Sequence, residues 1–209
     1  MPAPVHVSDH PLVAHNTARL RHKDTPPPLF RELVAEISRV LFYEAIRDVR
    51  LESVTVPTPI ADCPGRRVAE RVGLVPVLRA GLGMAEAMLD ALPDAAVWHL
   101  GLYRDHLTLK PVEYYNKLPA DPALDLGLVL DPMLATGGSA IAALDVLRRA
   151  GVPRLKFVGL IAAPEGVAAL QAAHPDVPVY LAAIDERLNE LGYIVPGLGD
   201  AGDRQFGTR

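Results

Sequence analysis

The segment LVLDPMLATGGSA, residues 128–140, decides the fold class of this chain. Its first three residues are apolar, Asp131 follows them, and a loop of small residues then leads into a helical pattern near residues 140–150. A buried strand that ends in an acid and passes through a tight loop into a helix is typical of α/β proteins with a parallel sheet. The rest of the chain is interpreted outward from this unit.

Further apolar runs of strand length occur on both sides of the segment, and helical patterns separate them. The runs are apolar at successive positions, which is typical of strands that are buried on both faces. We therefore expect one α/β domain over residues 1–209, with about five mainly parallel strands flanked by helices. The expected strands are 74–78, 96–102, 126–130, 155–163 and 177–184, and the expected helices are 26–46, 82–91, 140–150 and 165–173.

The composition excludes several classes of protein. The chain has 209 residues, of which 50% are hydrophobic and 22% charged, so it differs from disordered sequences. A formal net charge of −4 gives no basic surface for nucleic acid, and no apolar stretch approaches the ~20 residues that cross a bilayer. A single cysteine, Cys63, cannot form an intramolecular disulfide. We expect a cytoplasmic protein with neither a nucleic-acid nor a membrane partner.

One segment, YRDHLTLKPVEYYNKLP at residues 103–119, departs from the alternation of strands and helices. It is polar and partly alternating, which favours a β-arm that projects from the sheet. Because such arms often form subunit contacts or lids, the segment motivates the expectation of a homo-oligomer.

Charged residues follow four of the expected strands, namely Arg79, Arg104, Asp131 and Asp185. In open parallel sheets the carboxyl ends of the strands meet at one edge, and ligands bind there. We therefore expect these groups to lie at one edge of the sheet. The alternative is that strand ends are simply where solvent-exposed charge begins.

The loop at residues 135–139, ATGGS, has the composition of an anion site. Adjacent glycines let successive N–H groups point at one anion, and Thr136 and Ser139 add hydroxyl donors. The helix that follows contributes about half a positive charge at its N-terminus, and Ser139 is expected to cap it. The loop therefore predicts a phosphate site beside Asp131, although a tight turn without a ligand would have the same composition.

The segment at residues 128–140 resembles the phosphoribosyl diphosphate signature of type I phosphoribosyltransferases, and in particular that of the uracil phosphoribosyltransferases. Three further segments are similar to that family in the same order: PVLRAGLGM (76–84), the expected arm (103–119) and YIVPGLGDAG (193–202). The resemblance spans essentially the whole chain. It implies the type I phosphoribosyltransferase fold, with a projecting β-arm and a hood built from terminal segments.

The resemblance also implies an activity. The expected reaction transfers phosphoribose from 5-phospho-α-D-ribose 1-diphosphate (PRPP) to N1 of uracil, and it gives UMP and diphosphate. Mg²⁺ would arrive with PRPP and would have no direct protein ligand. A homodimer or higher homo-oligomer and GTP as an effector are further implications of the resemblance alone.

The family's site residues are carried over to matching positions. The implied catalytic residues are Arg79, Arg104, Asp131 and Asp200. The implied PRPP-binding residues are Arg79, Arg104, Asp131, Pro132, Met133, Leu134, Ala135, Thr136, Gly137, Gly138, Ser139 and Asp200. The implied uracil-binding residues are Ile194, Gly199, Asp200 and Ala201. The resemblance gives Asp200 a place beside PRPP, and whether it also takes the N1 proton is left open.

One departure from the wider superfamily narrows the choice of base. Many type I enzymes have acids where this chain has Pro132 and Ala135, and the uracil enzymes share the departure. This argues against a purine or orotate enzyme. The alternative from another class is a pyrimidine-responsive RNA-binding regulator on the same fold. That reading is opposed by the single Asp131 and by the net charge of −4.

Overall fold

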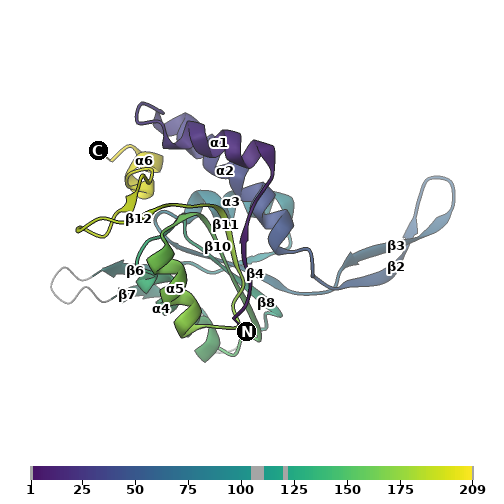
Figure 1. Ribbon diagram of the computed structural model, residues 1–209. Coiled ribbons are helices and arrows are strands. Elements are labelled where there is room, and N and C mark those ends of the chain that lie inside the picture. Colours follow the sequence, from purple (N-terminus) through teal and green to yellow (C-terminus); the bar gives the residue numbers. More distant parts are fainter. Residues whose placement is uncertain (1, 105–110, 120–121, 209) are drawn as a thin grey trace.

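A mainly parallel sheet forms the centre of the protein in the computed structural model, which describes residues 2–104, 111–119 and 122–208 (Figure 1). Its main path is β1 (Val5–Val7), β11 (Val179–Ile184), β10 (Arg154–Ala162), β8 (Leu126–Leu130), β4 (Val72–Leu78), β6 (Leu100–Arg104) and β7 (Pro111–Asn116). Neighbouring strands along this path are parallel, except for the last pair, β6 and β7, which is antiparallel. Two short strands extend the sheet: β5 (Ala96–Val97) pairs with β4, and β9 (Met133–Leu134) pairs with β10.

Helices cover both faces of this sheet. On one face lie α2 (Pro27–Ala45) and α3 (Leu82–Ala91), with α1 (Pro11–Arg21) packed against α2. On the other face lie α4 (Gly138–Arg149) and α5 (Pro164–Ala173). The predicted α/β class with a mainly parallel sheet is therefore confirmed.

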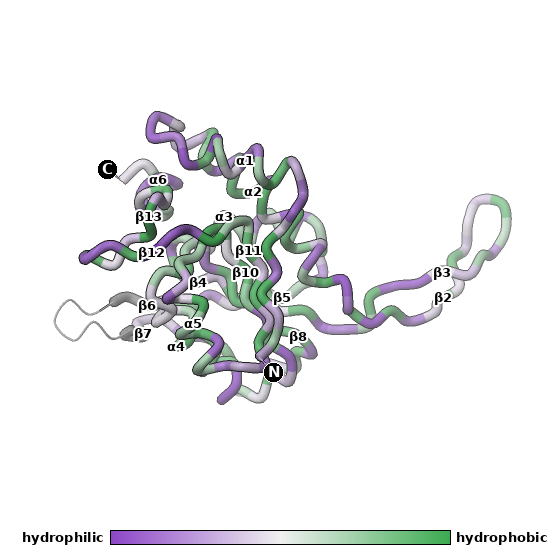
Figure 2. The backbone as a smooth tube through the Cα atoms, viewed as in Figure 1, coloured by the Kyte–Doolittle hydropathy of each residue, from purple (hydrophilic) through white to green (hydrophobic). Residues whose placement is uncertain are grey.

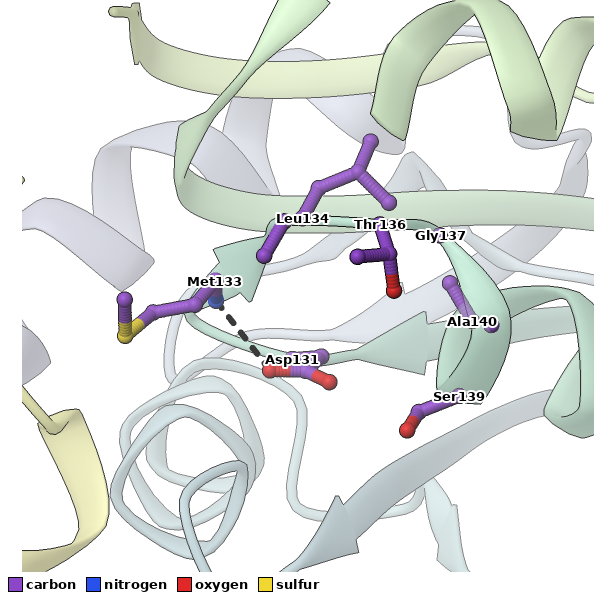
Figure 3. A pocket seen from close by; sticks show the side chains of 9 residues that line it. Asp131, Met133, Leu134, Thr136, Gly137, Ser139 and Ala140 are labelled. Atoms are coloured by element: carbon purple, nitrogen blue, oxygen red, sulfur yellow. Dashed lines mark hydrogen bonds between the residues drawn. The ribbon is translucent and has the colours of Figure 1, made fainter. Parts of the chain in front are cut away.

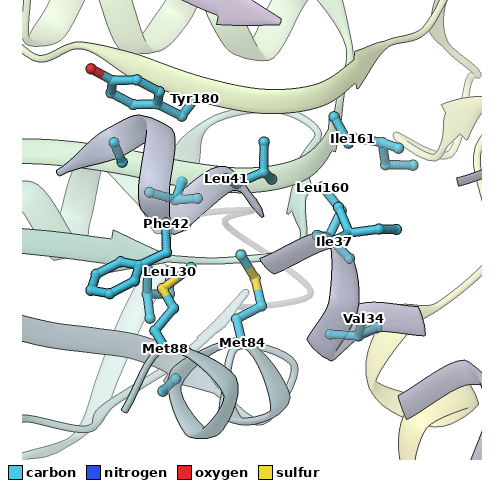
Figure 4. Close-up of a cluster of buried hydrophobic side chains, with 14 of the residues drawn as sticks. Val34, Ile37, Leu41, Phe42, Met84, Met88, Leu130, Leu160, Ile161 and Tyr180 are labelled. Carbon is cyan, nitrogen blue, oxygen red and sulfur yellow. The ribbon is translucent and has the colours of Figure 1, made fainter. Parts of the chain in front are cut away.

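The alternation of side chains along each strand divides the interior into two hydrophobic clusters. Leu128 and Leu130 of β8 pack with α2 and α3, whereas Val129 between them packs with α4. Figure 4 shows part of the first cluster, in which Phe42 of α2 lies against Met88 of α3 and Leu130 of the sheet. Because both faces of a strand are buried, its sequence is apolar at successive positions.

Most predicted elements are found within one or two residues of their expected bounds. The expected strand 96–102 is divided into β5 and β6. Two elements near the N-terminus, β1 and α1, were not predicted. Strand β1 is too short to show a period, and only Val13, Thr17 and Leu20 of α1 are buried, so its apolar pattern is weak.

The expected β-arm at residues 103–119 lies partly outside the described residues, which omit 105–110. The described part agrees with a hairpin, since β6 and β7 pair antiparallel at the end of the sheet. A different hairpin projects far from the body: β2 (Leu51–Pro57) paired with β3 (Asp62–Val68) (Figure 1). It was not predicted, because both of its faces are largely exposed and no apolar face marks it in the sequence.

Apolar residues nevertheless extend along this hairpin to its tip, as the hydropathy colours in Figure 2 show. Ile60 at the tip is 93% exposed, and Val56 is also exposed. An exposed apolar arm is a typical feature of an interaction surface.

The C-terminal segment lies over the carboxyl edge of the sheet. It consists of the short hairpin β12 (Arg187–Leu188) and β13 (Ile194–Val195), followed by α6 (Ala201–Phe206), which packs on α2. Together with the end of α1, this segment forms the hood that the resemblance implies (Figure 1). Within the described ranges, no helix is long and apolar enough to cross a membrane.

Two adjacent residues of α2 test the packing of the core. Replacing the fully buried Phe42 with Ala should lower the free energy of unfolding by about 3–5 kcal/mol, because a cavity is left between α2, α3 and the sheet. Replacing Tyr43, which is 60% exposed, with Ala should change it by about 0.5 kcal/mol or less. Urea denaturation measures both values, and similar losses for the two variants would contradict the described packing.

Candidate active site

A pocket of about 180 Å³ opens at the carboxyl end of β8 (Figure 3). Its lining comes from one continuous unit of the chain: the acid after β8, the turn through β9, the loop at residues 135–139 and the start of α4. The side chains of Asp131, Thr136 and Ser139 face this space. The lining residues are Asp131, Met133, Leu134, Ala135, Thr136, Gly137, Gly138, Ser139 and Ala140.

We call residues 135–139 the phosphate loop. Gly137 is the N-cap of α4 and has a φ of +84°, a left-handed conformation that favours glycine. A Cβ there would also lie 3.1 Å from the carbonyl oxygen of Gly166. Gly166 itself allows α5 to approach the loop, since its own Cβ would lie 2.3 Å from the Ala135 oxygen.

The expectation that Ser139 caps α4 was wrong. Gly137 occupies the N-cap position, no side chain caps the helix, and Ser139 is the second residue of its first turn. The first N–H groups of a helix have no acceptor within the helix, so an uncapped N-terminus leaves them available to a ligand. The serine hydroxyl is then a second donor at the same pocket.

Asp131 lies at the floor of the pocket and accepts a hydrogen bond of 3.1 Å from the Met133 N–H. The residue keeps partial contact with solvent, while its carboxyl group is surrounded by protein. The net effect of its surroundings raises the pKa of Asp131 to about 7; burial is the main cause, and the nearby negative charge of Asp200 acts in the same direction. The Met133 hydrogen bond acts in the opposite direction. Asp131 thus changes charge near neutral pH, and a cation at the pocket would favour its ionised form.

Arg79 follows β4, the strand beside β8, and is therefore brought to the same edge. Gly81 permits the close approach, because a Cβ there would lie 2.4 Å from the carbonyl oxygen of Leu130. In this structure the Arg79 guanidinium is 3.3 Å from a carboxylate oxygen of Asp203 and lies over the ring of Phe206. Just over half of the Arg79 side chain remains exposed.

Arg104 ends β6, the next parallel strand, so its backbone is placed at the same edge. Its side chain lies outside the described residues. Asp185 follows β11 and is at this edge too. The expected gathering of Arg79, Asp131 and Asp185 at one edge of the sheet is confirmed.

The residues implied to bind uracil lie in the hood. We call residues 194–201 the base turn. Ile194 is buried in β13, Gly199 has a φ of +81°, and Ala201 is the first residue of α6. Asp200 is the N-cap of that helix and accepts a hydrogen bond of 2.8 Å from the Asp203 N–H. The base turn is outside the lining of the 180 Å³ pocket, and Asp200 connects the two regions through its effect on Asp131.

Three residues that the sequence prediction did not assign to the site hold the base turn. Asp185 and Arg21 bond to Gly197, and Arg204 bonds to the carbonyl oxygen of Leu198. The position of Asp185 after a strand was a usable signal. Arg21 is the last residue of α1, which was not predicted, and no sequence pattern marks it as a site residue.

Replacing Asp131 with Asn should stabilise the unliganded protein most at alkaline pH. The folded pKa of about 7 lies above the unfolded value of 3.8, so the folded state binds this proton more tightly than the unfolded state does. The stability that the bound proton contributes is complete below pH 3.8 and is lost as the pH rises through 7. Asn cannot lose a proton, so the variant keeps this stability at high pH. At ~1.4 kcal/mol per pKa unit, the advantage of the variant should grow by roughly 2–3 kcal/mol between pH 5 and pH 8.

Denaturant unfolding at the two pH values measures this change. Asp94→Asn, at an exposed position, is the control and should show no such growth. An Asp131→Asn advantage that is equal at both pH values would contradict a raised pKa.

With this geometry described, comparison with known proteins identifies the family. The family model described as uracil phosphoribosyltransferase matches residues 7–208. A uracil phosphoribosyltransferase of Roseiflexus sp. (strain RS-1) is 65% identical over 206 residues, which cover 99% of each chain.

Two solved structures place the fold. The AQ2163 protein from Aquifex aeolicus has 38% identity and a TM-score of 0.92, and the match covers 97% of this chain and 98% of that one. A purine phosphoribosyltransferase from Pyrococcus horikoshii has 15% identity and a TM-score of 0.51 over 73% of this chain and 83% of its own, and it shows the fold alone. The chain therefore belongs to the uracil phosphoribosyltransferase family and has the type I phosphoribosyltransferase fold.

Proposed function

We propose that the protein transfers phosphoribose from PRPP to N1 of uracil and gives UMP and diphosphate. The observation that carries the proposal is the meeting of three groups at one edge of the sheet: the phosphate loop, Arg79 with Asp131, and the base turn. Full-length similarity to enzymes of this name supports the choice of reaction. The RNA-binding alternative gains no support from these relatives.

The phosphate loop suits the 5′-phosphate of PRPP. The first residues of α4 line one pocket, and the hydroxyls of Thr136 and Ser139 face it. A phosphomonoester dianion there would interact with several donors and with the positive end of the helix dipole.

Charge separation is the main barrier of the reaction. As the bond between the anomeric carbon and the diphosphate breaks, negative charge grows on the leaving group and positive charge grows on the ribose. Arg79, which follows β4, is proposed to stabilise the leaving diphosphate, and Arg104 at the end of β6 is proposed as a second cation. The bond from N1 of uracil forms at the same carbon, and the N1 proton is lost.

Asp131 is proposed to accept hydrogen bonds from the ribose hydroxyls and to favour the positive ribose electrostatically. Its pKa of about 7 means that the unliganded carboxyl is partly protonated at neutral pH. Positive charge next to it lowers the pKa, so substrate binding itself would favour the carboxylate that the transition state needs. Asp200 lies near enough to influence Asp131, and its contact with PRPP remains part of the proposal.

The base turn is proposed to read the acceptor, donor and acceptor edge of uracil with main-chain groups near Ile194, Gly199 and Ala201. Cytosine would place a donor against a donor there. A mismatch of this kind in a closed site can reject a substrate by roughly 10⁴-fold.

Mg²⁺ is proposed to enter with PRPP as its diphosphate complex. Throughout the described ranges, no group of three or more His, Cys, Asp or Glu side chains could hold a metal ion. The oxygens of a diphosphate and water suit Mg²⁺, which needs no protein cage in such a complex.

The protein is further proposed to form a homo-oligomer, to be activated by GTP and to be cytoplasmic. The exposed apolar residues of the β2–β3 hairpin support contacts between copies of the chain. The exposed free thiol of Cys63 suits a reducing compartment. GTP rests on the family resemblance only, and an assay with and without GTP tests it.

The deciding experiment measures UMP formation from uracil and PRPP with Mg²⁺. Parallel reactions contain cytosine, orotate or hypoxanthine, and Asp131→Asn serves as the inactive control. We expect turnover with uracil alone and a loss of at least about 10²-fold in the control, the scale of one lost transition-state interaction. A folded wild-type chain that binds UMP without turnover would contradict the proposed enzyme.

A pair of glycine substitutions tests the phosphate loop. Gly137 and Gly151 both have left-handed φ values, +84° and +80°, but a Cβ at Gly151 meets nothing within 4 Å. Alanine at either position should therefore cost a similar backbone strain of about 1 kcal/mol. Only Gly137→Ala should also weaken PRPP binding, by roughly tenfold or more, because it disturbs the loop. Isothermal titration with PRPP and Mg²⁺ measures this difference, and equal affinities would remove the loop from the site.

A further inference from the structure

Arg21, Asp185 and Gly197 of the base turn form a closed hydrogen-bonded ring. The Asp185 carboxylate accepts from both terminal nitrogens of Arg21, with a distance of 2.7 Å from Nη1 to Oδ2, and the second bond joins Nη2 to Oδ1. Arg21 Nη1 also donates to the carbonyl oxygen of Gly197 at 2.7 Å, and the Gly197 N–H donates to Asp185 Oδ2 at 2.8 Å. Both polar groups of one glycine are thus bound by one ion pair.

This glycine cannot move freely within its turn. Its φ is +66°, and a Cβ would lie 2.2 Å from the carbonyl oxygen of Ile194, so the chain folds tightly back on itself here. A second arginine holds the next residue, since Arg204 Nη1 donates to the Leu198 oxygen at 2.7 Å. Arg204 Nη2 also donates to the oxygen of His22, directly after Arg21. Gly197 and Leu198 of the base turn are therefore both connected to the end of α1, Gly197 through Arg21 and Leu198 through Arg204 and His22.

The ion pair is largely buried, and this indicates what it contributes. The Asp185 side chain is 4% exposed and the Arg21 side chain 23% exposed. Buried ion pairs are seldom more stabilising than apolar side chains of similar volume, because both charges lose their hydration. What an apolar pair could not supply is a donor and an acceptor for Gly197. The geometry therefore indicates that the ion pair fixes the position of the Gly197 backbone and does more than stabilise the fold.

We propose that Arg21 and Asp185 are positioning residues for base recognition, which act through the Gly197 peptide and do not touch the substrates. We call them the Arg21–Asp185 clamp. The proposal rests on the proposed function, in which the base turn reads uracil with main-chain groups. The Gly197 peptide lies two residues before Gly199, so its orientation sets the direction in which the following N–H and C=O groups point. The clamp thus determines affinity for the base and discrimination between bases. Its effect on PRPP binding is small, because Asp200, the residue of the base turn that is proposed to contact PRPP, is held separately as the N-cap of α6.

Conservative variants separate positioning from folding. Arg21→Lys keeps the charge and loses the fork that binds Asp185 and Gly197 together. Asp185→Asn keeps the shape and places an amide donor among donors. For each variant we expect the KM for uracil to rise by at least about tenfold, with up to about 10²-fold for a misplaced recognition group. The KM for PRPP should change by less than about twofold.

A double variant tests the alternative that the ion pair only stabilises the folded protein. Arg21→Met with Asp185→Leu replaces the ion pair with apolar side chains and leaves Gly197 without partners. If the clamp positions the base turn, this chain should fold with a near-normal Tm and still show the raised KM for uracil. A normal uracil KM in a folded double variant would overturn the proposal, and so would a parallel rise in the KM values of both substrates.

Matched controls lie within two positions of each residue. Arg19→Met changes an exposed arginine in the last turn of α1, and Glu186→Gln changes an exposed acid beside Asp185. Both should behave as wild type. Equal effects in controls and clamp variants would also overturn the proposal.

The rate of amide hydrogen exchange in residues 194–201 measures how firmly the clamp holds the base turn, and it needs no turnover. Faster exchange confined to this segment is expected in Arg21→Lys and Asp185→Asn, and unchanged exchange would contradict a clamp. Failure of the proposed function is recognised separately: wild-type protein would then lack uracil turnover, whatever the exchange data show.

Discussion

The parallel pairing of β8 with β4 on one side and β10 on the other is the constraint on which the site depends. Because all three strands run in the same direction, their carboxyl ends emerge together, and the residues that follow them are neighbours in space. Glycines then allow the connecting loops to pack at backbone distance. Gly81 brings the Arg79 loop against the end of β8, and Gly166 brings α5 against the phosphate loop. The pocket is therefore a product of sheet topology and of missing Cβ atoms more than of any single side chain.

Sequence patterns predicted the part of the fold in which burial is strongest. Strand β8 and helix α3 were placed with the observed bounds because their apolar positions are dictated by burial on both faces or on one face. The β2–β3 hairpin was not predicted, since exposure on both faces removes the pattern that burial imposes. The same physical reason explains why α1 was overlooked.

The candidate site shows the same division. The phosphate loop and Asp131 could be predicted, because a strand, an acid and a glycine pair are contiguous in the sequence. The contacts of the hood could not, because they join residues far apart in the chain and depend on how its ends fold over the sheet. Arg21 reaches Asp185 across 164 positions, and no local pattern carries that information. The prediction that Ser139 caps α4 failed for a smaller reason: Gly137, in the left-handed conformation, is the N-cap, two residues before the expected position.

The hood joins the two ends of the chain, and this has a consequence for the order in which the protein is completed. The sheet and the phosphate loop are formed by residues up to about 184, and their contacts are available to a chain that is still being made. The base turn has no such independence. Its anchors lie in a helix near the beginning of the chain and in the last short helix, with hydrogen bonds that span 174 residues from Arg31 to Gln205 and 182 residues from Arg204 to His22. The residues that form the phosphate loop and its strands thus precede the base turn in the chain, and the base turn depends on contacts between segments that are made far apart in time.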